Sequence, residues 1–233
     1  MNNRSTVTLI RKDSGVTSFS SLRYVKKHVN KKTGHCGTLD KFATGLLIAC
    51  CGKYTKKVPL FMGLDKEYVA VIEFGTETDT LDPEGKITER ASVPSFETIR
   101  KNVEMMTGTV MQAPPAYSAL HVDGKRSYEL ARKGLVVQPE KRPVVIHRAE
   151  ILNWSSPYLT LRLNVSKGTY VRSYARDLGL ACGSRGYVTA LERTKIGPFS
   201  VSEAVLWNDA ESLENLDSDT ADVLLSRLED CTK

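Results

Sequence analysis

The most informative stretch of the sequence is a glycine-rich segment, GHCGTLD, at residues 34–40. It places a carboxylate, Asp40, shortly after a histidine, His35, and it leads into an apolar run that begins at Ala43. Glycine adopts backbone angles that other residues avoid and lets a ligand approach the main chain. We therefore interpret Asp40 as a nucleophile or an acid/base group presented to a bulky ligand. Asp is also a favoured helix N-cap, and spacing alone does not separate the two interpretations.

Two further side chains are candidates for chemistry. Tyr68 stands at the start of the clearest predicted strand, residues 67–75, and Arg172 lies one turn into a helix predicted to open at Gly168. Each has a structural alternative. A tyrosine at a strand start is often an ordinary core residue, and an arginine can be a surface ion-pair partner of little energetic weight.

Other kinds of site are disfavoured by the motifs of the sequence. The four histidines lack metal-ligand spacing, so we predict no metal site. No phosphate-binding GxxxxGK[ST] loop, strand-coupled GxGxxG or GxSxG elbow is present, so we predict no nucleotide cofactor and no serine hydrolase. Cys36 next to His35 could indicate a thiol nucleophile, but nothing else in the sequence supports it.

The elements that must position these residues follow from periodicity and turn residues. Apolar residues at helical spacing predict a helix over 19–29, with Ser18 as its cap and a basic outward face. Further helices are predicted at 96–106, 127–133, 168–181 and 223–228, and strands at 6–11, 67–75, 144–152 and 158–166. Asp123-Gly124 predicts a hairpin over 121–125. Antiparallel hairpins dominate this pattern, which favours an α+β architecture with a mixed sheet.

Length and composition set the broad class. The 233 residues, 41% of them hydrophobic, suffice for one large domain or two modest ones. No apolar run is long enough to span a membrane, and the N-terminus lacks the pattern of a secretory signal. Five scattered cysteines without CxxC pairs fit reduced thiols, so we expect a cytoplasmic protein.

Charge is distributed unevenly along the chain. Residues 203–233 hold nine acidic and two basic residues, whereas residues 1–202 hold 31 basic and 18 acidic residues. So basic a body attracts polyanions, because neutralised phosphates release their counterions. The residues alone therefore predict a cytoplasmic, nucleic-acid-binding α+β protein with a carboxylate as its candidate catalytic group.

Four segments together resemble the TruB-type tRNA pseudouridine synthase family. In chain order they are GHCGTLDKFATGLL, KEYVAVIEFGTETDTLDPEG, QAPPAYSALHVDGKRSYELARKG, and GTYVRSYARDLG followed by TALERTKIGPF. Four motifs in register are far more specific than one. The resemblance covers residues 7–199 and implies the pseudouridine synthase fold, a central mixed, mostly antiparallel sheet with flanking helices and an active-site cleft.

The resemblance also implies roles for individual residues. Asp40 would be the nucleophile, Tyr68 would stack on the target base, and Arg172 would pair with Asp40. His35 would fill the space left by the flipped base. The remaining substrate-binding positions are expected to be Gly37, Thr38, Leu39, Tyr170 and Leu191, the last two lining the uracil pocket. The implied reaction is isomerisation of the T-loop uridine at position 55 of tRNA, which needs no cofactor.

Several departures from the family pattern qualify these expectations. Lys41 replaces the usual proline after the aspartate, Asp13 stands where a proline is common, and Glu192 replaces a frequent arginine. We expect a catalytic domain over residues 1–200 and a short acidic tail over 201–233, without the PUA domain that many relatives append. That tail would cover part of the core or be disordered. We also expect a monomer.

Overall fold

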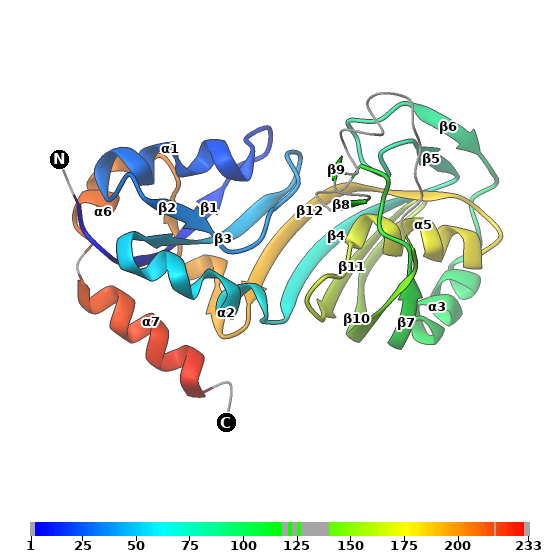
Figure 1. Ribbon diagram of the computed structural model, residues 1–233. Helices are drawn as coiled ribbons and strands as arrows, with labels where there is room; N and C mark the ends of the chain where they lie inside the picture. The colour runs from blue at the N-terminus through cyan, green and yellow to red at the C-terminus, as the bar shows by residue number, and fades with distance from the viewer. Residues whose placement is uncertain (1–2, 118–120, 123–124, 127–139, 217, 231–233) are drawn as a thin grey trace. The chain divides into compact units, whose positions relative to one another are not determined.

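The apolar run that follows Asp40 folds into a strand, β3 (Thr44–Cys51), in the computed structural model. The structure describes residues 3–117, 121–122, 125–126, 140–216 and 218–230 (Figure 1). The chain divides into two units, the first made of residues up to 68 and from 191 onward, and the second of residues 69–190. Every helix in the described part of the chain is too short or too polar to cross a bilayer.

The sheet of the first unit has β3 at its centre. The strand β1 (Val7–Lys12) pairs antiparallel with β3 along its whole length, from Val7 opposite Cys50 to Lys12 opposite Gly45. The strand order is β14-β1-β3-β12, and the β1–β14 and β3–β12 pairs are parallel. The other strands are β2 (Thr33–His35), which pairs with β3, β12 (Gly186–Ile196), β13 (Phe199–Ser200) and β14 (Val205–Leu206).

Both faces of β3 are covered, because side chains alternate along a strand. Leu46 and Ile48 pack in one buried cluster with residues of α2 and α7, while Leu47 and Ala49 pack in another with residues of α1 and α6. Figure 1 shows α1 and α6 on one side of these strands and α7 on the other. The helices of this unit are α1 (Ser18–His28), the 3₁₀ helix η1 (Gly52–Lys57), α2 (Val58–Met62), the 3₁₀ helix η2 (Val201–Glu203), α6 (Ala210–Glu214) and α7 (Ser218–Asp230).

The acidic tail contributes to this core. Ala221, Leu224 and Leu228 of α7 are buried against Val7 and Leu9 of β1. Of the two alternatives for the tail, coverage of the core is therefore the one that the structure shows. The helix predicted over 223–228 exists but is longer, since α7 begins at Ser218.

The second unit is also built on a sheet. Its strand order is β12-β4-β11-β10-β7, with β10 antiparallel to both β11 and β7. The helix α3 packs against α5 and β10. The elements are β4 (Lys66–Phe74), β5 (Thr76–Thr78), β6 (Ile87–Arg90), α3 (Phe96–Met105), β7 (Gly108–Gln112), β8 (His121–Val122), β9 (Lys125–Arg126), β10 (Arg142–Ser155), β11 (Tyr158–Val165) and α5 (Val171–Ala181).

Most predicted elements are confirmed, as is the α+β class with its mixed sheet. The strands on either side of Asp123-Gly124 pair antiparallel as expected, whereas the helix predicted over 127–133 lies outside the described residues. The strand β12 was not predicted, because a charged residue, Arg193, takes one of its buried positions and interrupts the apolar alternation. The predicted cap was wrong by one residue. Thr17 caps α1 by accepting the Ser20 amide at 3.0 Å, because Ser18 is already helical.

Candidate active site

Asp40 lies in the loop between β2 and β3, and no helix begins there, so the helix-cap interpretation is wrong. Its side chain is partly exposed. Two glycines shape this loop by adopting positive φ angles, +96° at Gly37 and +111° at Gly45. A Cβ atom on Gly45 would overlap the backbone of Arg193. The glycines predicted to allow unusual backbone geometry therefore do so on both sides of the carboxylate.

A buried serine binds the backbone just before Asp40. The Ser18 hydroxyl donates to the Leu39 carbonyl at 2.9 Å and accepts from the Leu39 amide at 2.8 Å. Ser18 is 2% exposed and belongs to the first turn of α1. Since one hydroxyl satisfies both backbone groups of Leu39, it fixes the direction in which the chain enters Asp40.

A buried lysine binds the backbone just after Asp40. The Lys12 ammonium group donates to the Lys41 carbonyl at 3.2 Å and to the Val16 carbonyl at 2.7 Å. The same Lys41 carbonyl accepts the Gly15 amide at 2.9 Å. Lys12 is 0% exposed, so its charge is stabilised by these oxygen acceptors instead of water.

Arg193 of β12 holds the start of the loop against β3. Its guanidinium donates to the Leu46 carbonyl at 2.8 Å, the Gly37 carbonyl at 3.3 Å and the Thr38 carbonyl at 3.5 Å. The side chain is 1% exposed. With Ser18 and Lys12 it forms a backbone clamp, three buried side chains that bind the loop on both sides of Asp40. None of these three roles could be predicted from the sequence, because a buried polar side chain carries no periodic signal.

His35 and Cys36 lie where β2 enters the loop. Burial, followed by the positive charge of Arg193, lowers the pKa of His35 below 6.5, so its imidazole is neutral at pH 7. The Cys36 thiol is fully buried 3.4 Å from the Cys50 sulfur, and that hydrogen bond together with burial raises its pKa. A buried thiol of raised pKa is a poor nucleophile, so the thiol interpretation is wrong.

Tyr68 and Leu191 are both buried, at 9% and 6% exposure. Tyr68 lies on β4 in the alternation that also buries Ala70 and Ile72, and Leu191 lies on β12. Their predicted roles in stacking on the base and lining a uracil pocket stay predictions.

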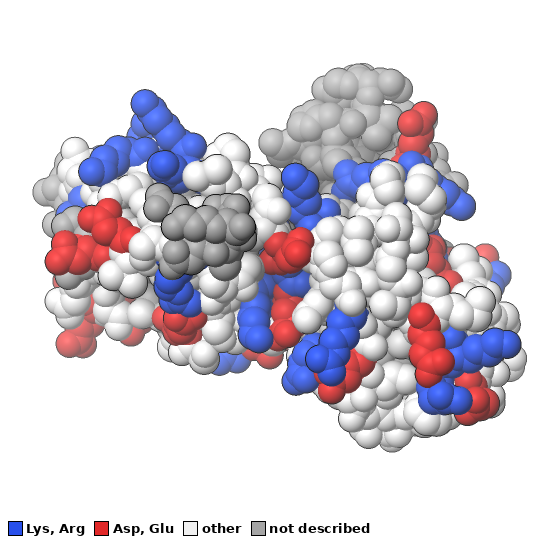
Figure 2. Space-filling model, turned by 90° about the horizontal axis from the view of Figure 1, so that it is seen from below, with Lys and Arg blue, Asp and Glu red and all other residues white. Residues whose placement is uncertain are grey.

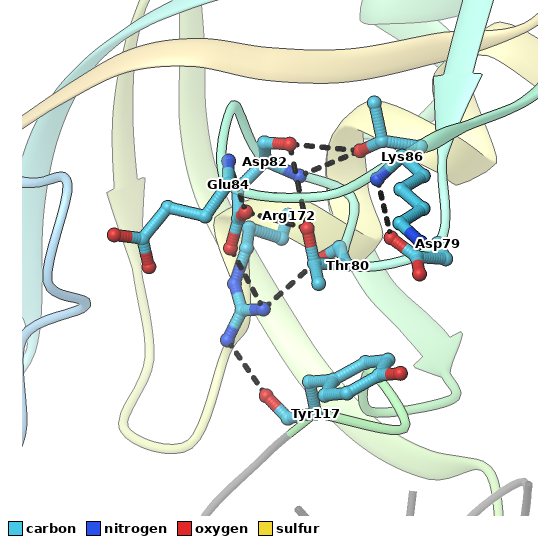
Figure 3. A network of polar contacts seen from close by, with 8 residues as sticks. Asp79, Thr80, Asp82, Glu84, Lys86, Tyr117 and Arg172 are labelled. Atoms are coloured by element: carbon cyan, nitrogen blue, oxygen red, sulfur yellow. Dashed lines mark hydrogen bonds and ion pairs between the residues drawn. The ribbon is translucent and has the colours of Figure 1, made fainter. Parts of the chain in front are cut away.

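In the second unit, Arg172 is the centre of a buried polar network (Figure 3). Its guanidinium donates to the Thr80 carbonyl at 2.9 Å and the Tyr117 carbonyl at 3.1 Å, and lies 3.3 Å from an Asp82 carboxylate oxygen. Arg172 is 4% exposed, so the alternative of a surface ion pair is wrong. Its predicted pairing with Asp40 stays a prediction.

Asp82 is a further residue of this network, which the sequence interpretation passed over as part of a turn. Its other carboxylate oxygen accepts the Thr80 hydroxyl at 2.5 Å and the Glu84 amide at 3.0 Å. Leu81, between these partners of Arg172, has a φ of +62°, which is uncommon for a residue with a branched side chain. The signal in the sequence was the Asp-Pro pair at 82–83, since an Asp side chain often binds the backbone two residues ahead.

Tyr170 is the N-cap residue of α5, so the predicted helix exists but begins at Val171, three residues after the predicted start at Gly168. Its amide donates to the buried Gln112 side chain at 2.8 Å, and the Arg142 guanidinium lies 5.5 Å from its ring centroid. These contacts hold the ring at the start of the helix that carries Arg172. Among the described residues, no three His, Cys, Asp or Glu side chains are grouped so that they could hold a metal ion.

Comparison with known proteins gives a family match and similar relatives. A family model described as TruB family pseudouridylate synthase (N terminal domain) matches residues 25–171. A tRNA pseudouridine synthase B from Borreliella burgdorferi (strain ZS7) is 44% identical over 219 residues, which are 90% of this chain and 78% of that protein.

Two solved structures are similar. A chain of a Cbf5-Nop10-Gar1 complex has a TM-score of 0.65 and 28% identity over 84% of this chain, which spans 50% of that longer chain. A pseudouridylate synthase crystal structure has a TM-score of 0.50 and 16% identity, covering 91% of this chain and 74% of that one.

Proposed function

Because the chain belongs to the TruB family of pseudouridylate synthases, we propose that it isomerises the T-loop uridine of tRNA, at position 55, to pseudouridine. The pseudouridine synthase fold expected from the sequence is confirmed by its structural relatives. The observation that carries the proposal is the backbone clamp, which binds the loop on both sides of Asp40. Positioning of this kind favours a group that must meet a substrate atom in a defined direction.

The reaction breaks the N1–C1′ bond of uridine, turns the uracil and joins C5 to C1′. N1 gains a proton and C5 loses one, so the composition is unchanged and neither an oxidant nor a group donor is consumed. The Asp40 carboxylate either attacks C1′ or assists formation of a glycal, both of which are roles that carboxylates play at sugar carbons. We keep both routes open.

We further propose that Arg172 pairs with Asp40 when the substrate is bound. An opposite charge keeps a carboxylate ionised, and a guanidinium fixes its direction. A guanidinium carries five N–H donors, so the ion pair with Asp82 is compatible with a second carboxylate partner. The support for this pairing is the family resemblance.

The remaining roles concern the base. We propose that the target uridine leaves its stack, that Tyr68 stacks on it, and that Tyr170 and Leu191 line its pocket. His35, which is neutral at pH 7, would take the space that the base leaves. Gly37, Thr38 and Leu39 would contact the substrate through the main chain beside Asp40.

A T-arm stem-loop tests the reaction. The wild-type chain should convert one uridine, at the position equivalent to 55, as mapped by reverse-transcription stops after chemical modification of pseudouridine. Asp40→Asn should abolish conversion but retain RNA binding. Glu211→Gln, which removes an exposed carboxylate from α6, is the control and should convert normally.

The outcomes separate the parts of the proposal. Equal turnover by Asp40→Asn would show that Asp40 is not the nucleophile. Modification of another uridine would leave the chemistry intact and change the substrate, whereas binding without modification would favour an RNA-binding module. The molar mass measured by light scattering after size-exclusion chromatography would check the expectation of a monomer.

A further inference from the structure

The outer face of α1 carries one aromatic and three basic side chains. Phe19, Arg23, Lys26 and Lys27 stand at positions i, i+4, i+7 and i+8, which share one face of a helix. We call these four residues the α1 stripe. The helix contains no acidic residue, and the exposed side chains of Arg23 and Lys27 make no hydrogen bond or ion pair to other described residues. The stripe is therefore available to a ligand of negative charge.

Phe19 is the unusual member of the stripe. It is 70% exposed, and the Lys26 ammonium group lies 4.1 Å from its ring centroid. This cation–π contact covers one face of the ring, whereas the exposed fraction leaves much of the rest in water. A ring that a cation covers on one face can stack on a flat group through its exposed part. Basic surroundings favour a flat group that is linked to phosphates.

The stripe borders the loop that carries Asp40. Phe19 follows Ser18, whose hydroxyl binds the backbone of Leu39, the residue before Asp40. The charge of Lys26 also acts on His35, where it lowers the pKa after the larger effects of burial and Arg193. A nucleotide on the stripe would therefore neighbour the one at Asp40.

Not every face of the molecule has this character. On the face drawn in Figure 2, Lys and Arg side chains are interspersed with Asp and Glu side chains. The absence of acidic residues from the α1 stripe is therefore a local feature. The net charge of the chain alone does not explain it.

We propose that the α1 stripe is a second RNA contact, in which Phe19 stacks on an unpaired base next to the isomerised uridine while Arg23 and Lys27 bind the adjoining phosphates. The inference rests on the proposed function, because it takes the substrate to be a single-stranded RNA loop. Aromatic stacking of this kind recognises unpaired bases without strict sequence preference. The stripe would fix where the loop lies, and Asp40 would perform the chemistry.

Binding to the T-arm stem-loop is the test, measured in the full chain carrying Asp40→Asn so that no turnover occurs. Phe19→Ala should weaken binding about 5- to 150-fold, the range expected for loss of one stacked base. Phe19→Trp should bind within about threefold of the parent, whereas Phe19→Leu, which keeps apolar bulk without a π face, should resemble Phe19→Ala. Val223→Ala, an exposed apolar residue of the acidic α7, is the matched control and should have no effect.

Salt dependence separates the two kinds of contact. Arg23→Gln and Lys27→Gln should each reduce the slope of log affinity against log salt by about one, whereas Phe19→Ala should leave the slope unchanged. Parent-like binding by Phe19→Ala or by Phe19→Leu would overturn the stacking role. Because Asp40→Asn is inactive by design, these results can be read even if the wild-type chain fails to isomerise uridine.

Discussion

Arg172 and Asp82 form an ion pair of 3.3 Å in which the side chains are only 5% and 7% exposed. Each partner also binds Thr80. Arg172 donates to the Thr80 carbonyl, and Asp82 accepts a hydrogen bond from the Thr80 hydroxyl. A buried pair of this kind is difficult to break, because loss of one partner leaves the other charge without compensation. The pair therefore fixes the guanidinium that we propose to meet Asp40.

Asp82→Ala should accordingly lower the free energy of unfolding by about 3–5 kcal/mol. The double variant Asp82→Ala/Arg172→Met should lose less free energy of unfolding than the sum of the losses in the two single variants, because no buried charge remains unpaired. Urea unfolding of the three variants measures the coupling. Glu89→Ala breaks the more exposed ion pair with Arg185 and should cost at most about 1 kcal/mol. Additive losses in the double variant would contradict the pairing.

Ser18→Ala should reduce kcat more than it changes KM. The variant leaves both backbone groups of Leu39 without the hydroxyl that binds them, so Asp40 is positioned less well while the RNA surface is intact. Loss of a buried hydrogen-bond partner costs about 1–3 kcal/mol. Steady-state kinetics on the stem-loop would show the split, with Ser20→Ala, an exposed serine of the same helix, as control. A change confined to KM would indicate a role in binding instead.

Stability should fall on acidification through the titration of His35. Its folded pKa is lowered below the unfolded value of 6.5, so the unfolded chain binds more protons below that pH and stability is lost as the pH falls. Replacing the imidazole by His35→Gln should flatten this dependence between pH 7 and the lowered pKa. Urea unfolding of both proteins across that window provides the measurement, and parallel pH profiles would count against the assignment.

Leu224→Ala should destabilise the chain by about 2–5 kcal/mol, the usual cost of a buried leucine. Leu224 of α7 is 5% exposed in the cluster that contains Val7 and Leu9. Val223, its neighbour on the same helix, is 58% exposed, so Val223→Ala should change stability by less than about 0.5 kcal/mol. Thermal unfolding of the two variants compares them directly. Equal effects would mean that α7 does not complete the core.

Local sequence determined most of the elements and the loop that carries Asp40. The strand β11 could be predicted because Leu159, Leu161 and Leu163 alternate with polar residues, and all three are buried. The segment before β3 could be recognised because glycine spacing and an isolated carboxylate are local signals. The prediction of β11 depends on the alternation of side chains, and that of the segment before β3 depends on backbone preference. Both signals act between residues that are close in the sequence.

Tertiary structure alone decided what holds the groups that we propose to be catalytic. Arg193 binds the carbonyls of Gly37 and Thr38 across more than 150 residues of sequence, and Ser18 turned out to bind Leu39 instead of capping its helix. The sequence around Asp82 indicates only a turn, whereas the fold brings Asp82 next to Arg172. Hydrogen bonds and ion pairs between distant segments leave no periodic trace, because any polar side chain can make them once packing has excluded water.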